Sequence, residues 1–212
     1  MNNNSVSIKE IFNTAVRNQQ EKNFKVAKKL YEEILEIDSN HLKTLCNLGI
    51  VFKELGEHQK AKECYEKSIE IQPNHAKAHN SLGVVFKDLE ETEKAKACYE
   101  KAIEIDPNHA DAYSNLGVIF EELGELEKAK SWYEKTIQID PNHAIAHNNL
   151  GIVFKDLRDL KKAQDYYEKA IQINSSYVAA HINLGVVLKE LGDHQKAKSY
   201  YEKAIQINPS YP

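Results

Sequence analysis

Asparagine side chains recur along this chain at multiples of 34 residues, and they carry its clearest binding chemistry. An asparagine amide offers a hydrogen-bond donor and an acceptor together, and a peptide bond offers the complement of that pair. Amides at a regular pitch can therefore hold a polypeptide backbone without reading its sequence. The row consists of Asn47, Asn115, Asn149 and Asn183, and it is interrupted by Ser81.

Branched aliphatic residues and lysines accompany this row. The aliphatic residues follow each position of the row by three residues and are Ile50, Val84, Val118, Ile152 and Val186. The lysines flank the first two positions and are Lys43, Lys53, Lys77 and Lys87. The aliphatic residues would either accept apolar side chains of a ligand or pack on a neighbouring helix. Lys43 and Lys77, in the amino-terminal half, would favour acidic segments of a ligand.

Two histidine pairs have the four-residue spacing of metal ligands on a helix, His75 with His79 and His143 with His147. No third ligand of suitable type recurs near either pair, and a structural zinc site needs four. The chain also lacks a phosphate-binding loop, a nucleophile elbow and a Ser–His–Asp order. We therefore expect no metal, no cofactor and no catalytic residues.

These residues belong to a 34-residue unit that is repeated six times. A fixed period of this length indicates a stacked array in which each unit buries its apolar side against its neighbours. Residues 1–6 are expected to form a flexible tail, and residues 211–212 either the start of a missing seventh unit or the carboxyl-terminal end. The units are residues 7–40, 41–74, 75–108, 109–142, 143–176 and 177–210.

Each unit has the pattern of a helical hairpin. In the second repeat (residues 41–74), apolar residues from Leu45 to Phe52 mark one face of a first helix. Gly56 marks a break, after which a second helical pattern begins. Pro73 cannot continue that second helix, and Asn74 is expected to cap the next one. On the first helix, the asparagine row and its neighbours lie opposite the apolar face.

Small residues at fixed places predict close approach of the two helices. Five of the eight glycines, including Gly49, recur inside the first helix, where glycine costs about 1 kcal/mol relative to alanine. Their recurrence implies a contact that a side chain would block, and we attribute all eight glycines to helix packing. An aromatic residue such as Tyr65 recurs in the second helix and is expected to fill the space between repeats.

The combined pattern resembles the tetratricopeptide repeat (TPR) signature. In the second repeat the motif consists of Leu48, Gly49, Phe52, Ala61, Tyr65 and Pro73. The resemblance covers almost the whole chain and is strong for five of the six units. It implies an all-α fold, a right-handed superhelical solenoid of antiparallel helix pairs with about twelve helices. In such a solenoid the first helices line a concave groove.

The sequence around the asparagines resembles the TPR array of O-linked N-acetylglucosamine transferases, as in residues 111–117 (DAYSNLG) and 145–151 (IAHNNLG). In those proteins an asparagine ladder at this position holds substrate polypeptide. The resemblance implies that role for the asparagine row, with a break at Ser81. The alternative is that asparagine at this position is a general feature of TPR units.

Composition narrows the classes of partner. With 28 basic and 32 acidic residues the net charge is −4, and no basic patch suggests nucleic acid as a partner. No apolar run is long enough to cross a bilayer, and the first residues do not have the pattern of a secretory signal. The three cysteines form no CxxC pair, which fits a reducing compartment. We expect a cytoplasmic protein with no membrane partner.

Three functions follow from these patterns. The first is a non-catalytic scaffold for protein–protein interaction that binds an extended polypeptide segment in the concave groove. The second is the substrate-recruiting arm of a larger transferase, of the glycosyltransferase or sulfotransferase type, whose catalytic domain is absent from this chain. The third is self-assembly through the carboxyl-terminal end, where the face around Tyr201 and Ile205 would be bare.

Overall fold

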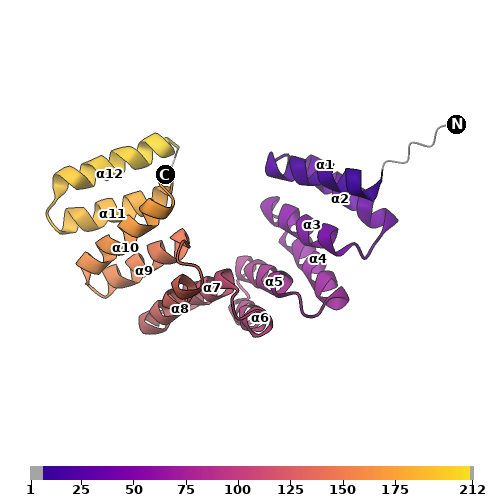
Figure 1. The fold of residues 1–212 in the computed structure, drawn as a ribbon, viewed down its shortest axis with the longest axis horizontal. Helices are drawn as coiled ribbons and strands as arrows, with labels where there is room; N and C mark the ends of the chain where they lie inside the picture. The colour runs from indigo at the N-terminus through magenta and orange to yellow at the C-terminus, as the bar shows by residue number, and fades with distance from the viewer. Residues whose placement is uncertain (1–6, 211–212) are drawn as a thin grey trace. The chain divides into compact units, whose positions relative to one another are not determined.

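The computed structural model describes residues 7–210, and all regular secondary structure in this range is α-helical (Figure 1). The expectations for residues 1–6 and 211–212 lie outside the described residues. The described helices are α1 (Ile8–Gln20), α2 (Phe24–Ile37), α3 (Leu42–Glu54), α4 (His58–Ile71), α5 (Ala76–Asp88), α6 (Thr92–Ile105), α7 (Ala110–Glu122), α8 (Leu126–Ile139), α9 (Ala144–Asp156), α10 (Leu160–Ile173), α11 (Val178–Glu190) and α12 (His194–Ile207).

The helices form consecutive antiparallel pairs, as the repeat predicts. A short turn joins α1 to α2, and the same arrangement recurs in every later pair. The chain divides into two compact units, residues 1–107 with α1–α6 and residues 108–212 with α7–α12. Within each unit, the second helix of one pair packs on the first helix of the next. The all-α array of helix pairs is therefore confirmed.

The turn inside each pair contains one residue in the left-handed backbone region. Gly56 has φ +73°, and Gly124 and Gly192 occupy the same place in their repeats. A Cβ added to any of these three glycines would meet nothing within 4 Å. Our attribution of all eight glycines to helix packing is therefore wrong for these three, which serve the backbone conformation. The other three repeats use Lys22, Glu90 and Arg158 at this place, all with positive φ.

The glycines inside the first helices do serve packing, and their partner is a tyrosine of the same repeat. A Cβ built on Gly49 would lie 2.7 Å from Cζ of Tyr65, whose side chain is buried. The tyrosine ring therefore fills space inside its own hairpin, rather than only between repeats as expected. The hydroxyl group is the part that extends toward the next repeat, since the hydroxyl of Tyr31 contacts Asn47.

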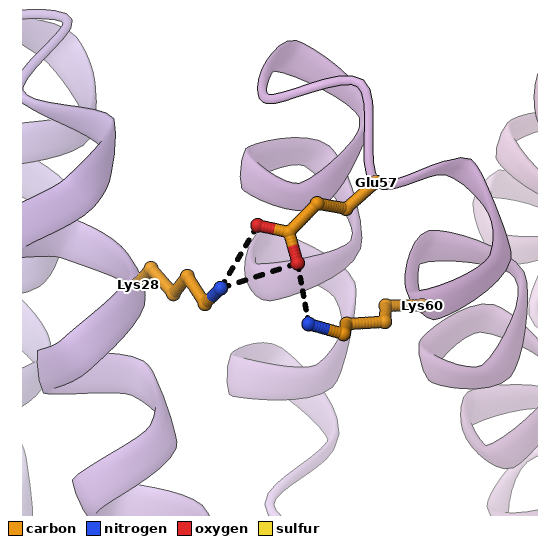
Figure 2. A network of polar contacts seen from close by, with 3 residues as sticks. All are labelled: Lys28, Glu57 and Lys60. Carbon is orange, nitrogen blue, oxygen red and sulfur yellow. Dashed lines mark hydrogen bonds and ion pairs between the residues drawn. The ribbon is translucent and has the colours of Figure 1, made fainter.

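Neighbouring pairs are also joined at the turn between α3 and α4, where Glu57 is the N-cap of α4. The carboxylate of Glu57 accepts hydrogen bonds from Lys28 of the preceding pair, at 2.8 Å and 3.2 Å, and from Lys60 of its own pair (Figure 2). Both ammonium groups also lie over the ring of Phe52, at 5.1 Å for Lys28 and 5.5 Å for Lys60. Hydrogen bonds from Lys28 and Lys60 lower the pKa of Glu57. The network therefore links α2 to the α3–α4 pair.

Two details at the repeat boundaries complete the fold. Helix α5 begins at Ala76 with His75 as its N-cap, so the expectation that Asn74 caps it is wrong, because Asn74 lies one residue too early. On α12, Ile205 is 63% exposed, whereas the corresponding Ile171 of α10 packs against the core of its unit. Tyr201, the other residue expected to be bare, is half-buried and packs against that core. Self-association through the carboxyl-terminal end stays a prediction.

Candidate peptide-binding site

A buried tyrosine links two amides on the first-helix face of the first unit. The Nδ2 group of Asn47 on α3 donates to the hydroxyl oxygen of Tyr31 on α2 at 3.2 Å. The same hydroxyl donates to Oε1 of Gln19 on α1 at 2.7 Å. Tyr31 is fully buried, and burial raises the pKa of its hydroxyl. The hydroxyl therefore stays protonated and holds both amides in one orientation.

This linkage leaves complementary groups available on two adjacent helices. Asn47 keeps its carbonyl oxygen and one N–H, and Gln19 keeps both amide N–H groups. Both residues line one hollow of about 380 Å³. A donor and an acceptor held in a common hollow can bond the C=O and N–H of a peptide backbone. The hollow is lined by Val16, Gln19, Gln20, Lys22, Phe24, Asn47, Ile50 and Glu54.

A second hollow lies beside the first and shares Asn47 with it. Its volume is about 390 Å³, and its lining is Phe12, Leu42, Lys43, Cys46, Asn47, Gln72 and His75. The Sγ atom of Cys46 lies 3.3 Å from the Ser68 hydroxyl, and burial raises the pKa of the thiol. Burial also lowers the pKa of His75. Near neutral pH the thiol of Cys46 is therefore protonated and uncharged, and it lines the hollow without acting as a nucleophile.

In the second unit the asparagines contact one another. Nδ2 of Asn183 donates to Oδ1 of Asn148 at 3.0 Å, and Nδ2 of Asn148 donates to Oδ1 of Asn149 at 3.2 Å. The Tyr133 hydroxyl donates to Oε2 of Glu121 at 2.8 Å. Burial and the Glu121 carboxylate raise the pKa of Tyr133, while a hydrogen bond with Asn149 lowers it. Tyr133 thus connects α7 and α9 as Tyr31 connects α1 and α3, with a carboxylate in place of the glutamine.

The aliphatic row divides between the two roles that the sequence left open. Ile50 is 37% exposed and lines the first hollow. Val118 and Ile152 pack against the core of the second unit. Val84 and Val186 are half-buried on their helices. Within this row, Ile50 is therefore the residue most exposed to a ligand.

The predicted lysines and the remaining asparagine lie as follows. Lys43 is exposed at the edge of the second hollow, and Lys77 is exposed on α5. Lys53 is half-buried and pairs with the adjacent carboxylate of Glu54 at 3.4 Å. Lys87 on α5 and Asn115 on α7 are half-buried. The structure therefore brings Lys43, Asn47 and Ile50 together, and it distributes the other predicted residues along the array.

The histidine pairs do not converge on a shared metal position. Nε2 of His79 lies 2.9 Å from the carbonyl oxygen of Pro73, and Nε2 of His147 lies 3.0 Å from that of Pro141. His143 instead accepts a hydrogen bond at Nδ1 from the backbone N–H of Ala146. Over residues 7–210 no group of three potential ligands could hold a metal ion. The same residues include no helix that is long and apolar enough to cross a membrane.

Several residues of the site were not predicted from the sequence. Gln19 occupies the repeat position at which the second repeat has Lys53 and later repeats have lysine or glutamate. This change from a charged side chain to an amide was the sequence signal that could have identified Gln19. Asn148 directly precedes Asn149, and only the packing of α9 against α11 reveals its contact with Asn183. The other residues not foreseen at the two hollows are Phe12, Gln20, Lys22, Phe24, Leu42, Cys46, Gln72 and His75.

Comparison with protein families agrees with this geometry. The family model described as "Tetratricopeptide repeat" matches residues 15–74, 42–108, 74–142, 108–176 and 144–210. The chain belongs to the tetratricopeptide repeat family. A search of curated protein sequences found no match. Membership of this family supports a role as a scaffold for protein–protein interaction.

Solved structures with the same fold include three of similar length. The Pseudomonas aeruginosa pilF protein is 20% identical, with 96% of this chain and 93% of that chain covered and a TM-score of 0.80. A MamA protein is 29% identical, with 80% and 92% covered and a TM-score of 0.63. YrrB, described as "a TPR protein with an unusual peptide-binding site", is 21% identical, with 85% and 93% covered and a TM-score of 0.58.

Proposed function

We propose that this chain is a non-catalytic scaffold that binds an extended polypeptide segment on the first-helix face of its helix pairs. The observation that carries the proposal is the linkage of Gln19, Tyr31 and Asn47, which holds two amides in fixed orientations at one hollow. The peptide-binding site ascribed to YrrB supports the same general role. The proposal requires no cofactor and no chemical step.

The expected affinity follows from the groups available. Each hydrogen bond from a fixed amide to a peptide backbone contributes roughly 0.5–1.5 kcal/mol. Burial of an apolar ligand side chain against Ile50 and Val16 adds roughly 25 cal/mol for each Å² removed from water. Ordering the ligand opposes both contributions. We therefore expect modest affinity that depends on the pre-oriented amides. Because Tyr31 already orients both side chains in the free protein, binding requires little further loss of their conformational entropy.

A selection experiment tests this function and requires no identified partner. A library of random twelve-residue peptides is displayed on phage and selected against the purified chain, and enriched peptides are synthesised with a fluorescent label. Their binding to the wild type is compared with binding to Gln19→Ala/Asn47→Ala. The matched control is Asn74→Ala, which removes an exposed asparagine amide outside both hollows.

The expected result is that enriched peptides lose at least tenfold in affinity for the double variant and bind the control variant like the wild type. Circular dichroism of all three proteins verifies equal helical content. Selection that enriches no peptide, or peptides that bind the double variant as tightly as the wild type, contradicts the proposed function at this site.

A further inference from the structure

A third hollow continues the two already described, and it lies between the turn after α1, the start of α2 and the end of α3. It shares Lys22 and Phe24 with the first hollow, as the second hollow shares Asn47. Its lining is Lys22, Asn23, Phe24, Lys25, Val26 and Leu55. We call this continuous path, from Lys43 at the start of α3 to the turn after α1, the α1–α3 seam.

The length of the seam corresponds to a short peptide. Lys43 and Leu55 are separated by twelve residues of α3 and its C-cap, which at a rise of about 1.5 Å per residue spans about 18 Å. An extended chain advances about 3.3 Å per residue. A segment of about six residues therefore reaches from one end of the seam to the other. Such a segment runs along the helices, whereas the asparagine row suggests one that crosses successive repeats.

Both ends of the seam carry exposed lysines, and one of them, Lys22, also lines the central hollow. Lys43 is exposed at one end, and Lys22 and Lys25 are exposed at the other. Within the described residues, none of these three side chains takes part in an ion pair. The middle contains the carboxylate of Glu54, which disfavours an acidic residue there.

The middle of the seam also contains apolar side chains. Val16, Phe24 and Ile50 line the central hollow together with the amides of Gln19 and Asn47. This arrangement suits a ligand whose central side chains are apolar and whose backbone bonds the amides. Val26, which is 48% exposed, extends the apolar lining toward Lys25.

No other seam within either unit has bases at both ends. Between α3 and α5, Lys77 takes the place of Lys43, but Gly56 and Gln59 replace the basic pair. In the second unit, Ile145 and Ala179 take the place of Lys43. The charge arrangement of the α1–α3 seam therefore does not follow from the repeat itself, and it distinguishes this seam chemically from its structural equivalents.

We propose that the α1–α3 seam binds an extended peptide segment of about six residues that is apolar in its middle and acidic at both ends. One acidic side chain pairs with Lys43, and the other pairs with Lys22 and Lys25. The inference rests on the proposed function and deepens it, because it specifies the chemistry and the direction of the bound segment.

The test uses three synthetic peptides with a fluorescein label on a glycine linker. They are Asp-Leu-Val-Leu-Leu-Asp, its lysine-ended counterpart Lys-Leu-Val-Leu-Leu-Lys, and the rearranged Leu-Asp-Val-Leu-Asp-Leu. Fluorescence anisotropy measures their affinities for the full chain at low and high salt. We expect the acid-ended peptide to bind at least tenfold more tightly than either of the others at low salt, and to lose that preference at high salt.

Charge reversal locates the binding. Lys43→Glu and Lys22→Glu/Lys25→Glu are each expected to weaken binding of the acid-ended peptide by about fivefold or more, since exposed ion pairs contribute little individually. The control is Lys77→Glu, which reverses the equivalent exposed charge on α5. A peptide with one lysine end and one aspartate end should regain affinity for Lys43→Glu, and amide shifts in the NMR spectrum should concentrate in α1 and α3.

Two results overturn the inference while leaving the proposed function to its own test. The first is an acid-ended peptide that binds no better than its rearranged counterpart. The second is a loss of affinity in Lys77→Glu as large as that in Lys43→Glu. If library-selected peptides still depend on Gln19 and Asn47 in either case, the face binds polypeptide and only its direction and charge preference are refuted.

Discussion

The amide of Asn47 on α3 donates a hydrogen bond to the hydroxyl of Tyr31 on α2 across 3.2 Å. This contact joins a residue of the first-helix face to the buried interior of the preceding repeat. It also ties stability to binding, because the hydroxyl that orients Asn47 at the same time bonds Gln19. Changes at Tyr31 should therefore affect both properties.

Replacing Tyr31 with phenylalanine removes one hydroxyl and keeps the ring. The side chains of Asn47 and Gln19 then lose their shared partner, and we expect a loss of about 1 kcal/mol, since both amides can still reach water. Urea unfolding followed by circular dichroism measures the change. Tyr166→Phe, at a half-buried tyrosine of α10, is the control and should shift the midpoint less. Equal shifts would show that the linkage contributes nothing specific.

Replacing Gly49 with alanine should destabilise the chain even though alanine favours helices. The new Cβ would lie 2.7 Å from the ring of Tyr65, which is 2% exposed and has no room to retreat. Overpacking of this kind costs about 1–3 kcal/mol, which exceeds the gain of about 1 kcal/mol in helix propensity. Thermal unfolding measures the sum.

A double-mutant cycle identifies the cause of that loss. If the clash with Tyr65 is responsible, Gly49→Ala should cost less in a Tyr65→Leu background than in the wild type. The same cost in both backgrounds would place the strain elsewhere.

Replacing Glu90 with glycine should stabilise the chain. Glu90 has φ +62°, in the left-handed region that costs a non-glycine residue about 1–2 kcal/mol. The greater freedom of glycine in the unfolded chain offsets about 0.4–1 kcal/mol of that gain. We expect a net increase of about 0.5–1 kcal/mol in urea unfolding. Glu93→Gly, in the helical backbone of α6, should have the opposite sign, and a loss of stability in both variants would refute the assignment of strain to Glu90.

Acidification should destabilise the second unit through His147. Burial lowers the pKa of this imidazole from the ordinary value of 6.5, so the folded state favours the neutral ring. The unfolded chain binds the proton more readily, so this contribution is complete above about pH 6.5 and is lost as the pH falls toward the folded pKa. The measurement is the thermal midpoint between pH 7.5 and 5.5.

His147→Leu provides the comparison for that pH dependence, because Leu45 occupies the equivalent place in the second repeat. This variant should lose less stability on acidification than the wild type does. A His147→Leu variant with an unchanged pH dependence would show that the pKa of His147 does not differ between the folded and unfolded states.

The sequence by itself determined the helix pairs and the residues on their two faces. The period of 34 residues, the helical spacing from Leu45 to Phe52 and the stop at Pro73 are local signals, and the structure follows them. Gly49 likewise indicated a close approach, because a glycine kept inside a helix costs stability unless something occupies the space of its side chain. The ring that occupies this space, that of Tyr65, required the structure.

Only the tertiary structure decided which atoms of the site are already engaged and which remain for a ligand. Asn47, Asn149 and Asn183 occupy one register of the repeat, yet the first bonds a tyrosine and the last bonds Asn148. The periodicity of a helix gives the direction in which a side chain points. The partner it meets depends on the rotation and spacing of the next helix, and on a neighbour such as Gln19 that lies 28 residues away in sequence.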